Sequence, residues 1–123
     1  MPLNDNAKDT MLDALTDPTV VDHVSLHTAD PGSTGANEAT GGAPAYARKA
    51  ITWAAASAGS VAENTGTDPV FDVPAGTYTH LGLWDDLTLS ASTNFYGSAD
   101  ITDETYGGQG TYTLTGLTIT ITG

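Results

Sequence analysis

The sequence predicts a mainly β protein: a single-domain antiparallel β-sandwich or jelly-roll-like fold with one short N-terminal helix. The chain has 123 residues, which is enough for one hydrophobic core and too few for two. It is rich in Thr and contains 14 Gly and 6 Pro, a composition typical of strands and turns. About seven or eight short apolar segments alternate with turn signals. We therefore expect residues 1–123 to form one domain, with a helix at 4–16 and a β-sandwich at 20–123.

The N-terminal helix is predicted by the spacing of its apolar residues. These residues recur at helical intervals, at Ala7, Met11, Ala14 and Leu15. Asn4 or Asn6 is a suitable N-cap, and Pro18 prevents the helix from continuing. We expect two or three helical turns.

The first strand is predicted at residues 20–28, where apolar and polar residues alternate. Val24 and Leu26 lead the apolar face, whereas His23 and His27 share the more polar face. A long loop at 29–45 follows, rich in residues with special backbone preferences. A second strand is predicted at 46–53.

The remaining strands are predicted from shorter patterns. Residues 54–68 form a weak strand with a connection, and further strands are expected at 68–76, 77–86, 88–101 and 111–122. In the last segment the apolar residues change from even to odd positions at Gly116. A strand that keeps one apolar face through this change needs a bulge, corner or tight turn there.

The charge of the chain excludes some partners. Three Lys and Arg residues oppose 15 Asp and Glu residues, which gives a net charge of -12. Such a chain repels nucleic acids and anionic membrane surfaces. The absence of Cys removes disulfides and thiolate metal sites. The sequence contains neither a long apolar run nor the pattern of a signal peptide, so we expect a protein that is not secreted and does not enter a membrane.

No residue is predicted to be catalytic, to hold a cofactor or to bind a metal. His23 and His27 would be about 13 Å apart on a straight strand, too far for one zinc ion, and we interpret the histidines as surface or interface residues. The adjacent pairs Asp85-Asp86 and Asp103-Glu104 are typical of solvated turns, with a loop calcium as the alternative. No catalytic sequence motif is present.

The aromatic residues have two interpretations. Trp53 and Phe71 are expected in the core, because a small domain needs most of its aromatic residues there. Trp84 stands beside Asp85, and this pair could stack on a sugar ring and bind its hydroxyls. Trp84, Asp85 and His27 are therefore candidate interface or glycan contacts.

The order of segments resembles a family of small virion structural proteins of tailed bacteriophages. Members are labelled tail fibre or minor tail protein, and in some phages minor capsid or head-decoration protein. The resemblance is carried by L-H-T-x-D-P-G at 26–32, Glu38, Y-A-R-K at 46–49 and T-H-L-G-L-W at 79–84. It covers nearly the whole chain, and none of these motifs is catalytic.

Arg48 is predicted to clamp the long loop. Arg48 and Lys49 are the only adjacent basic pair in a strongly acidic chain, and Asp30 and Glu38 lie nearby in the sequence. We expect Arg48 to form a bidentate ion pair with Asp30 or Glu38. In this interpretation the loop is ordered, and His27 ends the strand without taking part in chemistry.

The resemblance implies a non-enzymatic bacteriophage virion protein, made in the host cytoplasm. A head-decoration subunit that binds the major capsid protein is the leading hypothesis, because the chain lacks a fibrous repeat. A tail fibre or minor tail component that helps to attach the phage to its host is the alternative, and a carbohydrate-binding module is another. Other virion proteins are the expected partners, and self-association as a dimer or trimer is expected by analogy.

Overall fold

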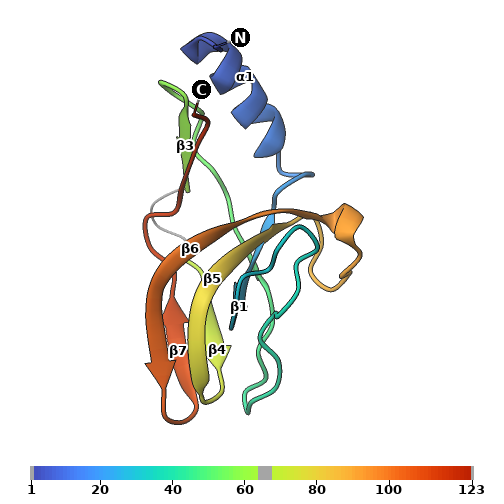
Figure 1. Cartoon of the computed structure of the whole chain (residues 1–123), viewed down its shortest axis with the longest axis vertical. Coiled ribbons are helices and arrows are strands. Elements are labelled where there is room, and N and C mark those ends of the chain that lie inside the picture. The colour runs from blue at the N-terminus through green and yellow to red at the C-terminus, as the bar shows by residue number, and fades with distance from the viewer. Residues whose placement is uncertain (1, 64–67, 123) are drawn as a thin grey trace.

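The structure, a computed structural model, describes residues 2–63 and 68–122 (Figure 1). It is mainly β, with one α-helix at the N-terminus, as predicted. The elements in chain order are α1 (Asp5–Leu15), β1 (His23–His27), β2 (Lys49–Ala50), β3 (Ser60–Ala62), β4 (Val70–Val73), β5 (Gly76–Trp84), the 3₁₀ turn η1 (Ser92–Asn94), β6 (Phe95–Tyr106), β7 (Gly110–Thr113) and β8 (Thr118–Thr120). Part of the weak strand expected at 54–68 lies outside the described residues.

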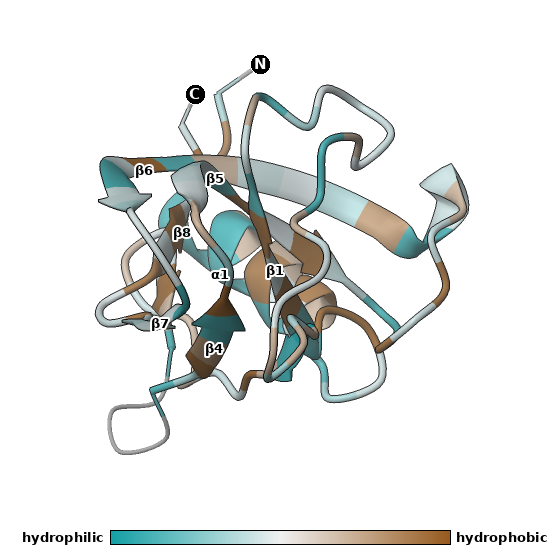
Figure 2. Cartoon of the chain, turned by 90° about the horizontal axis from the view of Figure 1, so that it is seen from below, coloured by the Kyte–Doolittle hydropathy of each residue, from teal (hydrophilic) through white to brown (hydrophobic). Residues whose placement is uncertain are grey.

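Antiparallel pairs build the sheets. The largest sheet has four strands in the order β2-β1-β5-β6, and two further pairs, β3 with β8 and β4 with β7, complete the fold. Figure 1 shows the long, curved β5 and β6 in front of β4 and β7. Figure 2 shows apolar stretches of β1, β4 and β8 gathered in the middle of the molecule. This arrangement confirms the predicted sandwich with a short N-terminal helix.

Carboxylates attach the helix to the β structure. Asn4 caps α1 by accepting a hydrogen bond from the backbone of Ala7, and Leu12 is its buried residue. Asp9 and Asp13 accept hydrogen bonds from the backbone N–H groups of Gly59 and Ala56. Two of the acidic residues of this helix therefore bind backbone donors next to β3, which explains why carboxylates are tolerated in its middle and towards its C-terminus.

The core lies between the large sheet and the strand pairs. Its buried members are Val21, Val24, Leu26, Ala39, Ile51, Phe71, Val73, Tyr78, Leu81, Leu83, Leu114 and Leu117. Phe71 is fully buried and Trp53 packs partly against the cluster. The expectation that these two aromatic residues belong to the core is therefore confirmed.

Gly116 marks a corner between sheets, as predicted. It adopts a φ of 72°, in the left-handed region that favours glycine. The strand before it, β7, pairs with β4, whereas the strand after it, β8, pairs with β3. The change of apolar parity in the sequence thus corresponds to the point at which the chain passes from one pair to the other.

Two predictions about the first strands need correction. Residues 24–27 are buried on both faces of β1, although the sequence suggested one polar face. The reason is that segment 29–45 folds back over this face: the carbonyl oxygen of Ala36 lies 2.7 Å from His27 Nδ1, and Gly35 packs against Trp84 on the neighbouring strand. The strand expected at 46–53 is also reduced to β2, because only Lys49 and Ala50 pair with β1.

Candidate functional site

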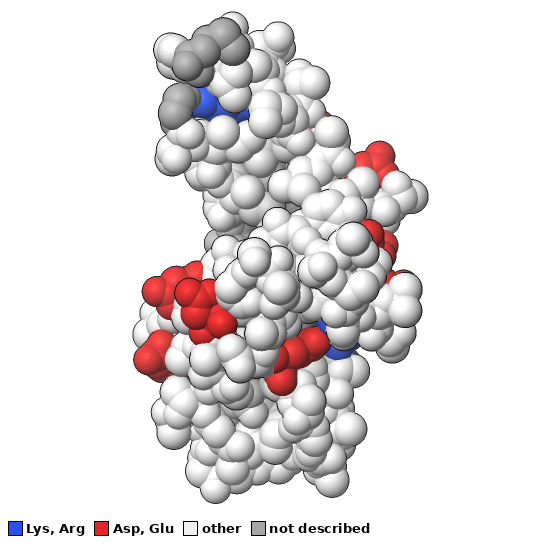
Figure 3. All heavy atoms as spheres, turned by 45° about the vertical axis from the view of Figure 1, so that its right-hand side comes forward, with Lys and Arg blue, Asp and Glu red and all other residues white. Residues whose placement is uncertain are grey.

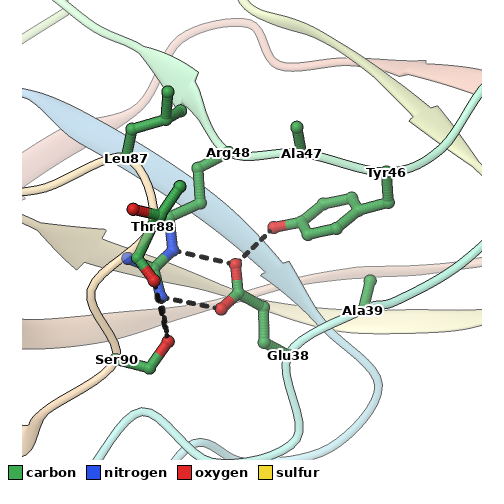
Figure 4. Close-up of a pocket in the computed structure, with 8 residues that line it drawn as sticks. All are labelled: Glu38, Ala39, Tyr46, Ala47, Arg48, Leu87, Thr88 and Ser90. Atoms are coloured by element: carbon green, nitrogen blue, oxygen red, sulfur yellow. Dashed lines mark hydrogen bonds and ion pairs between the residues drawn. The ribbon is translucent and has the colours of Figure 1, made fainter.

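The most connected polar side chain belongs to Arg48, which lies immediately before β2 and is 4% exposed. Its Nε and Nη2 donate to the two carboxylate oxygens of Glu38 at 2.9 and 2.8 Å. This is the bidentate geometry that makes an arginine and carboxylate pair strong and directional. Figure 4 shows the two side chains facing each other across the site.

The remaining donors of Arg48 bind the loop that follows β5. Nη1 donates to the backbone oxygens of Asp86 and Leu89 at 3.0 and 2.8 Å, and Nη2 also donates to Ser90 Oγ at 3.0 Å. A guanidinium has five N–H donors, so every donor of Arg48 has a partner. One side chain therefore joins segment 29–45 to the 86–90 loop.

Glu38 is held by a second side chain, Tyr46. The Tyr46 hydroxyl donates to Glu38 Oε2 at 2.9 Å and accepts from the backbone N–H of Leu26 at 3.0 Å. Burial, with the Glu38 carboxylate beside it, raises the pKa of Tyr46 above its usual value. The hydroxyl consequently stays protonated and keeps donating to Glu38.

Trp84 lies beneath this ion pair. The guanidinium carbon of Arg48 is 3.6 Å from the centroid of the Trp84 ring, a cation–π contact. Phe95 packs on the same indole, with ring centroids 4.9 Å apart. Gly35 has a φ of 78°, and a Cβ built there would collide with Cη2 of the indole and lie 2.6 Å from its Cζ2. The loop therefore packs against the Trp84 ring at Gly35, where the side chain of any larger residue would collide with the indole.

A buried hydrogen-bonded chain continues from Trp84 into β1. Trp84 Nε1 donates to Ser25 Oγ at 2.7 Å, and Ser25 Oγ lies 2.6 Å from His27 Nε2. His27 Nδ1 lies 2.7 Å from the carbonyl oxygen of Ala36. Because a carbonyl only accepts, Nδ1 carries the proton, and Ser25 must donate to Nε2. Burial lowers the pKa of His27, so its ring is neutral.

The contact between Ser25 and His27 has the spacing of a nucleophile and its base, but both residues are 0% exposed. A carbonyl occupies the position in which a carboxylate would orient the histidine. No substrate can reach the serine in this arrangement. The chain of hydrogen bonds instead satisfies polar groups inside the fold.

The structure brings together only part of the predicted set of site residues. Arg48 contacts Glu38 and not Asp30, whose carboxylate accepts a hydrogen bond from the Gly32 backbone in the exposed loop. Asp85 accepts from Asn94 Nδ2 at 2.8 Å and from the Tyr96 hydroxyl at 3.2 Å. Both aspartates therefore act in local turns.

The glycan contact predicted at Trp84 and His27 needs correction. Both side chains are 0% exposed, because segment 29–45 and Arg48 cover the face of the sheet that carries them. A sugar ring has no access to the indole. His27 is likewise an interior residue, whereas the sequence suggested a surface or interface position.

Several residues of this network were missed by sequence reasoning. Ser25 belongs to no motif, and Tyr46 appears only within Y-A-R-K, although it lies two residues before Arg48 and thus on the same side of an extended chain. The 86–90 loop contributes backbone carbonyls, which any sequence can supply. Gly82 leaves room for the network: a Cβ there would lie 2.6 Å from His27 Nε2 and 2.9 Å from Trp84 Nε1.

An open hollow of about 300 Å³ lies beside the ion pair. Its lining residues, drawn in Figure 4, are Glu38, Ala39, Tyr46, Ala47, Arg48, Leu87, Thr88 and Ser90. Because the donors of Arg48 are already used within the protein, the hollow offers no free cation to an anionic ligand. The arrangement fastens two loops together.

The acidic side chains do not gather into a metal site in the part of the chain that the structure describes. No group of three or more His, Asp or Glu residues is placed to hold an ion there. Among residues 2–63 and 68–122, no helix has the length and apolar character needed to cross a membrane.

Comparison with known families shows which family the chain resembles. The model of the family described as podophage GP4 fiber I protein gp80 matches residues 6–121 of the chain. The match extends over nearly all of the sequence, from the first turns of α1 to the end of the C-terminal segment. This chain belongs to that podophage fibre family. It is therefore a structural protein of the phage virion. The comparison with curated proteins gives no match.

Membership in the fibre family agrees with the resemblance seen in the sequence. The matched range contains Glu38, Tyr46, Arg48 and Trp84, the residues that form the clamp between the two loops. A virion protein of this fibre family associates with other virion proteins.

Proposed function

We propose that this chain is a non-enzymatic subunit of a podophage tail fibre that helps to attach the particle to its host. The match of residues 6–121 to a fibre protein family carries the proposal. The fold supports a structural role. The polar cluster around Arg48 fastens two loops together, and the hydrogen-bonded pair of Ser25 and His27 is fully buried. The clamp formed by Arg48 and Glu38 keeps segment 29–45 ordered for contact with other proteins.

A head-decoration subunit bound to the major capsid protein is the second candidate. The observation that favours it is the lack of any fibrous repeat in the sequence, because long fibres are commonly built from repeated units. Either assignment allows self-association as a dimer or trimer.

The copy number of the chain in purified virions separates the two candidates. Quantitative mass spectrometry gives the ratio of this chain to the major capsid protein. A few copies per particle, recovered with isolated tails, would support the fibre assignment. A ratio near one to one, or a simple fraction of the capsid lattice recovered with heads, would overturn it in favour of decoration.

A further inference from the structure

The strand β6 leaves one of its edges without a partner. β6 runs from Phe95 to Tyr106 and pairs only with β5, at the end of the four-stranded sheet. Within residues 2–63 and 68–122, no backbone hydrogen bond joins the other edge of the segment 96–106 to another element. Figure 1 shows β6 as the outermost strand on one side of the molecule. An exposed edge of this length is a template for pairing with another chain.

A groove follows this free edge. Two hollows of about 350 and 330 Å³ share Ala99, Leu117 and Thr118, so they lie next to each other along the strand. β6 forms one wall, and the segment from Tyr112 to Thr120 forms the other. Among the residues that the structure describes, the strands in that second wall, β7 and β8, pair only with β4 and β3, respectively. An extended peptide placed in the groove would therefore meet unpaired strand edges, with apolar residues such as Leu81 below it.

The charges along the groove identify the kind of peptide that fits. Asp100, Asp103 and Glu104 are exposed on β6, and the Asp100 side chain is 82% accessible. A second copy of this chain is a poor partner, because antiparallel pairing of two β6 strands would place carboxylates opposite one another. The whole chain has three cations, and Arg48 is buried in the clamp. Figure 3 shows only small areas of Lys and Arg on the face drawn.

We propose that the β6 edge receives an extended segment of a different protein, rich in Lys or Arg, as an added strand. Backbone hydrogen bonds to β6 provide the binding, and the carboxylates select a basic segment. Regular pairing uses residues 97–100, because the register between β5 and β6 shifts on both sides of this stretch, between Phe95 and Gly97 and between Asp100 and Glu104.

The test uses two synthetic nine-residue peptides, one alternating Lys with Val and one alternating Glu with Val. Hydrogen exchange of the purified protein is followed by mass spectrometry with each peptide in turn. The Lys peptide is expected to slow exchange in residues 97–100, and the Glu peptide is expected to leave it unchanged. Asp100→Asn with Glu104→Gln is expected to weaken binding of the Lys peptide about fivefold. The control is the double variant Asp5→Asn with Asp68→Asn. It changes the net charge by the same amount as the test variant, at exposed positions outside β6.

Three outcomes overturn the proposal. Equal loss of binding in the control double variant would mean that only net charge matters. Binding without protection of residues 97–100 would place the peptide elsewhere on the protein, and no binding of the Lys peptide would mean that the carboxylates only keep this edge from pairing. Protection of β6 by dimer formation at rising protein concentration, followed by sedimentation, would assign the edge to a second copy. Each result is independent of the copy number in virions, which tests the fibre assignment separately.

Discussion

The guanidinium of Arg48 lies 3.6 Å above the ring of Trp84 while it forms a bidentate ion pair with Glu38. Arg48 thus binds a charge on one side and an aromatic face on another, and its last donors hold the 86–90 loop. Lysine could not reproduce this arrangement, because it has three donors and no planar group to lie on the indole. The clamp therefore depends on arginine itself.

Removing the clamp is expected to destabilise the protein strongly. Arg48→Ala leaves the partly buried Glu38 carboxylate without its cation, so we expect a loss of about 3–5 kcal/mol in the free energy of unfolding. Arg48→Lys is expected to recover only part of it. Urea unfolding measures the stability, and limited proteolysis within residues 29–45 reports whether the loop is released. Lys49→Ala is the control, with an expected effect within about 0.5 kcal/mol; similar losses in both variants would contradict the clamp.

Gly82 is expected to tolerate no side chain. A Cβ at this position would contact Ser25 Oγ and lie 2.6 Å from His27 Nε2, so Gly82→Ala should push apart the buried hydrogen-bonded chain. We expect a loss of about 1–3 kcal/mol in the free energy of unfolding. Gly108→Ala is the matched control, because a Cβ there meets no atom within 4 Å. Equal melting temperatures for the two variants would contradict this prediction and show that Ser25 and His27 can move away from a methyl group at little cost in free energy.

The stability of the protein is expected to fall in mild acid because of His27. Burial lowers the pKa of His27 in the folded state, whereas the unfolded chain binds the proton at the ordinary value near 6.5. The contribution of the neutral ring is therefore complete above pH 6.5 and is lost as the pH falls below it. The slope is at most about 1.4 kcal/mol per pH unit. Urea unfolding between pH 7.5 and 5 measures it.

The variant His27→Gln isolates this effect from the other titrating groups. The Glu38 carboxylate and the Ala36 carbonyl favour the protonated ring, while Arg48 and His80 oppose it. We expect the difference in stability between wild type and variant to shrink as the pH is lowered from 7.5. A constant difference over this range would show that His27 has an ordinary pKa in the folded protein.

The contact between α1 and the turn before β3 is expected to depend on Asp9. Its carboxylate accepts a hydrogen bond of 2.8 Å from the Gly59 backbone, so Asp9→Ala leaves this donor without its partner. We expect a loss of about 1–3 kcal/mol and faster hydrogen exchange at Gly59. Asp9→Asn keeps an acceptor and is expected to lose less. If both variants behave like wild type, the helix is held by Leu12 and the other contacts alone.

Much of the fold follows from local patterns in the sequence. The spacing of apolar residues in 4–16, with Asn4 before them and Pro18 after them, is sufficient for a helix, and the structure places it at Asp5–Leu15. The alternation within 68–86 and the parity change at Gly116 similarly predict strands and a corner. These features depend on neighbours within a few residues, and the sequence displays those neighbours directly.

The sequence by itself thus determined the class of fold and the excess of negative charge. It also singled out Arg48, which belongs to the only adjacent basic pair of an acidic chain. Only the tertiary structure decided that Glu38 rather than Asp30 pairs with Arg48, and that the sheet face bearing His27 and Trp84 is covered. Those outcomes depend on how a long segment folds back over distant strands. Alternation along one strand shows which residues share a face, but it does not show what covers that face.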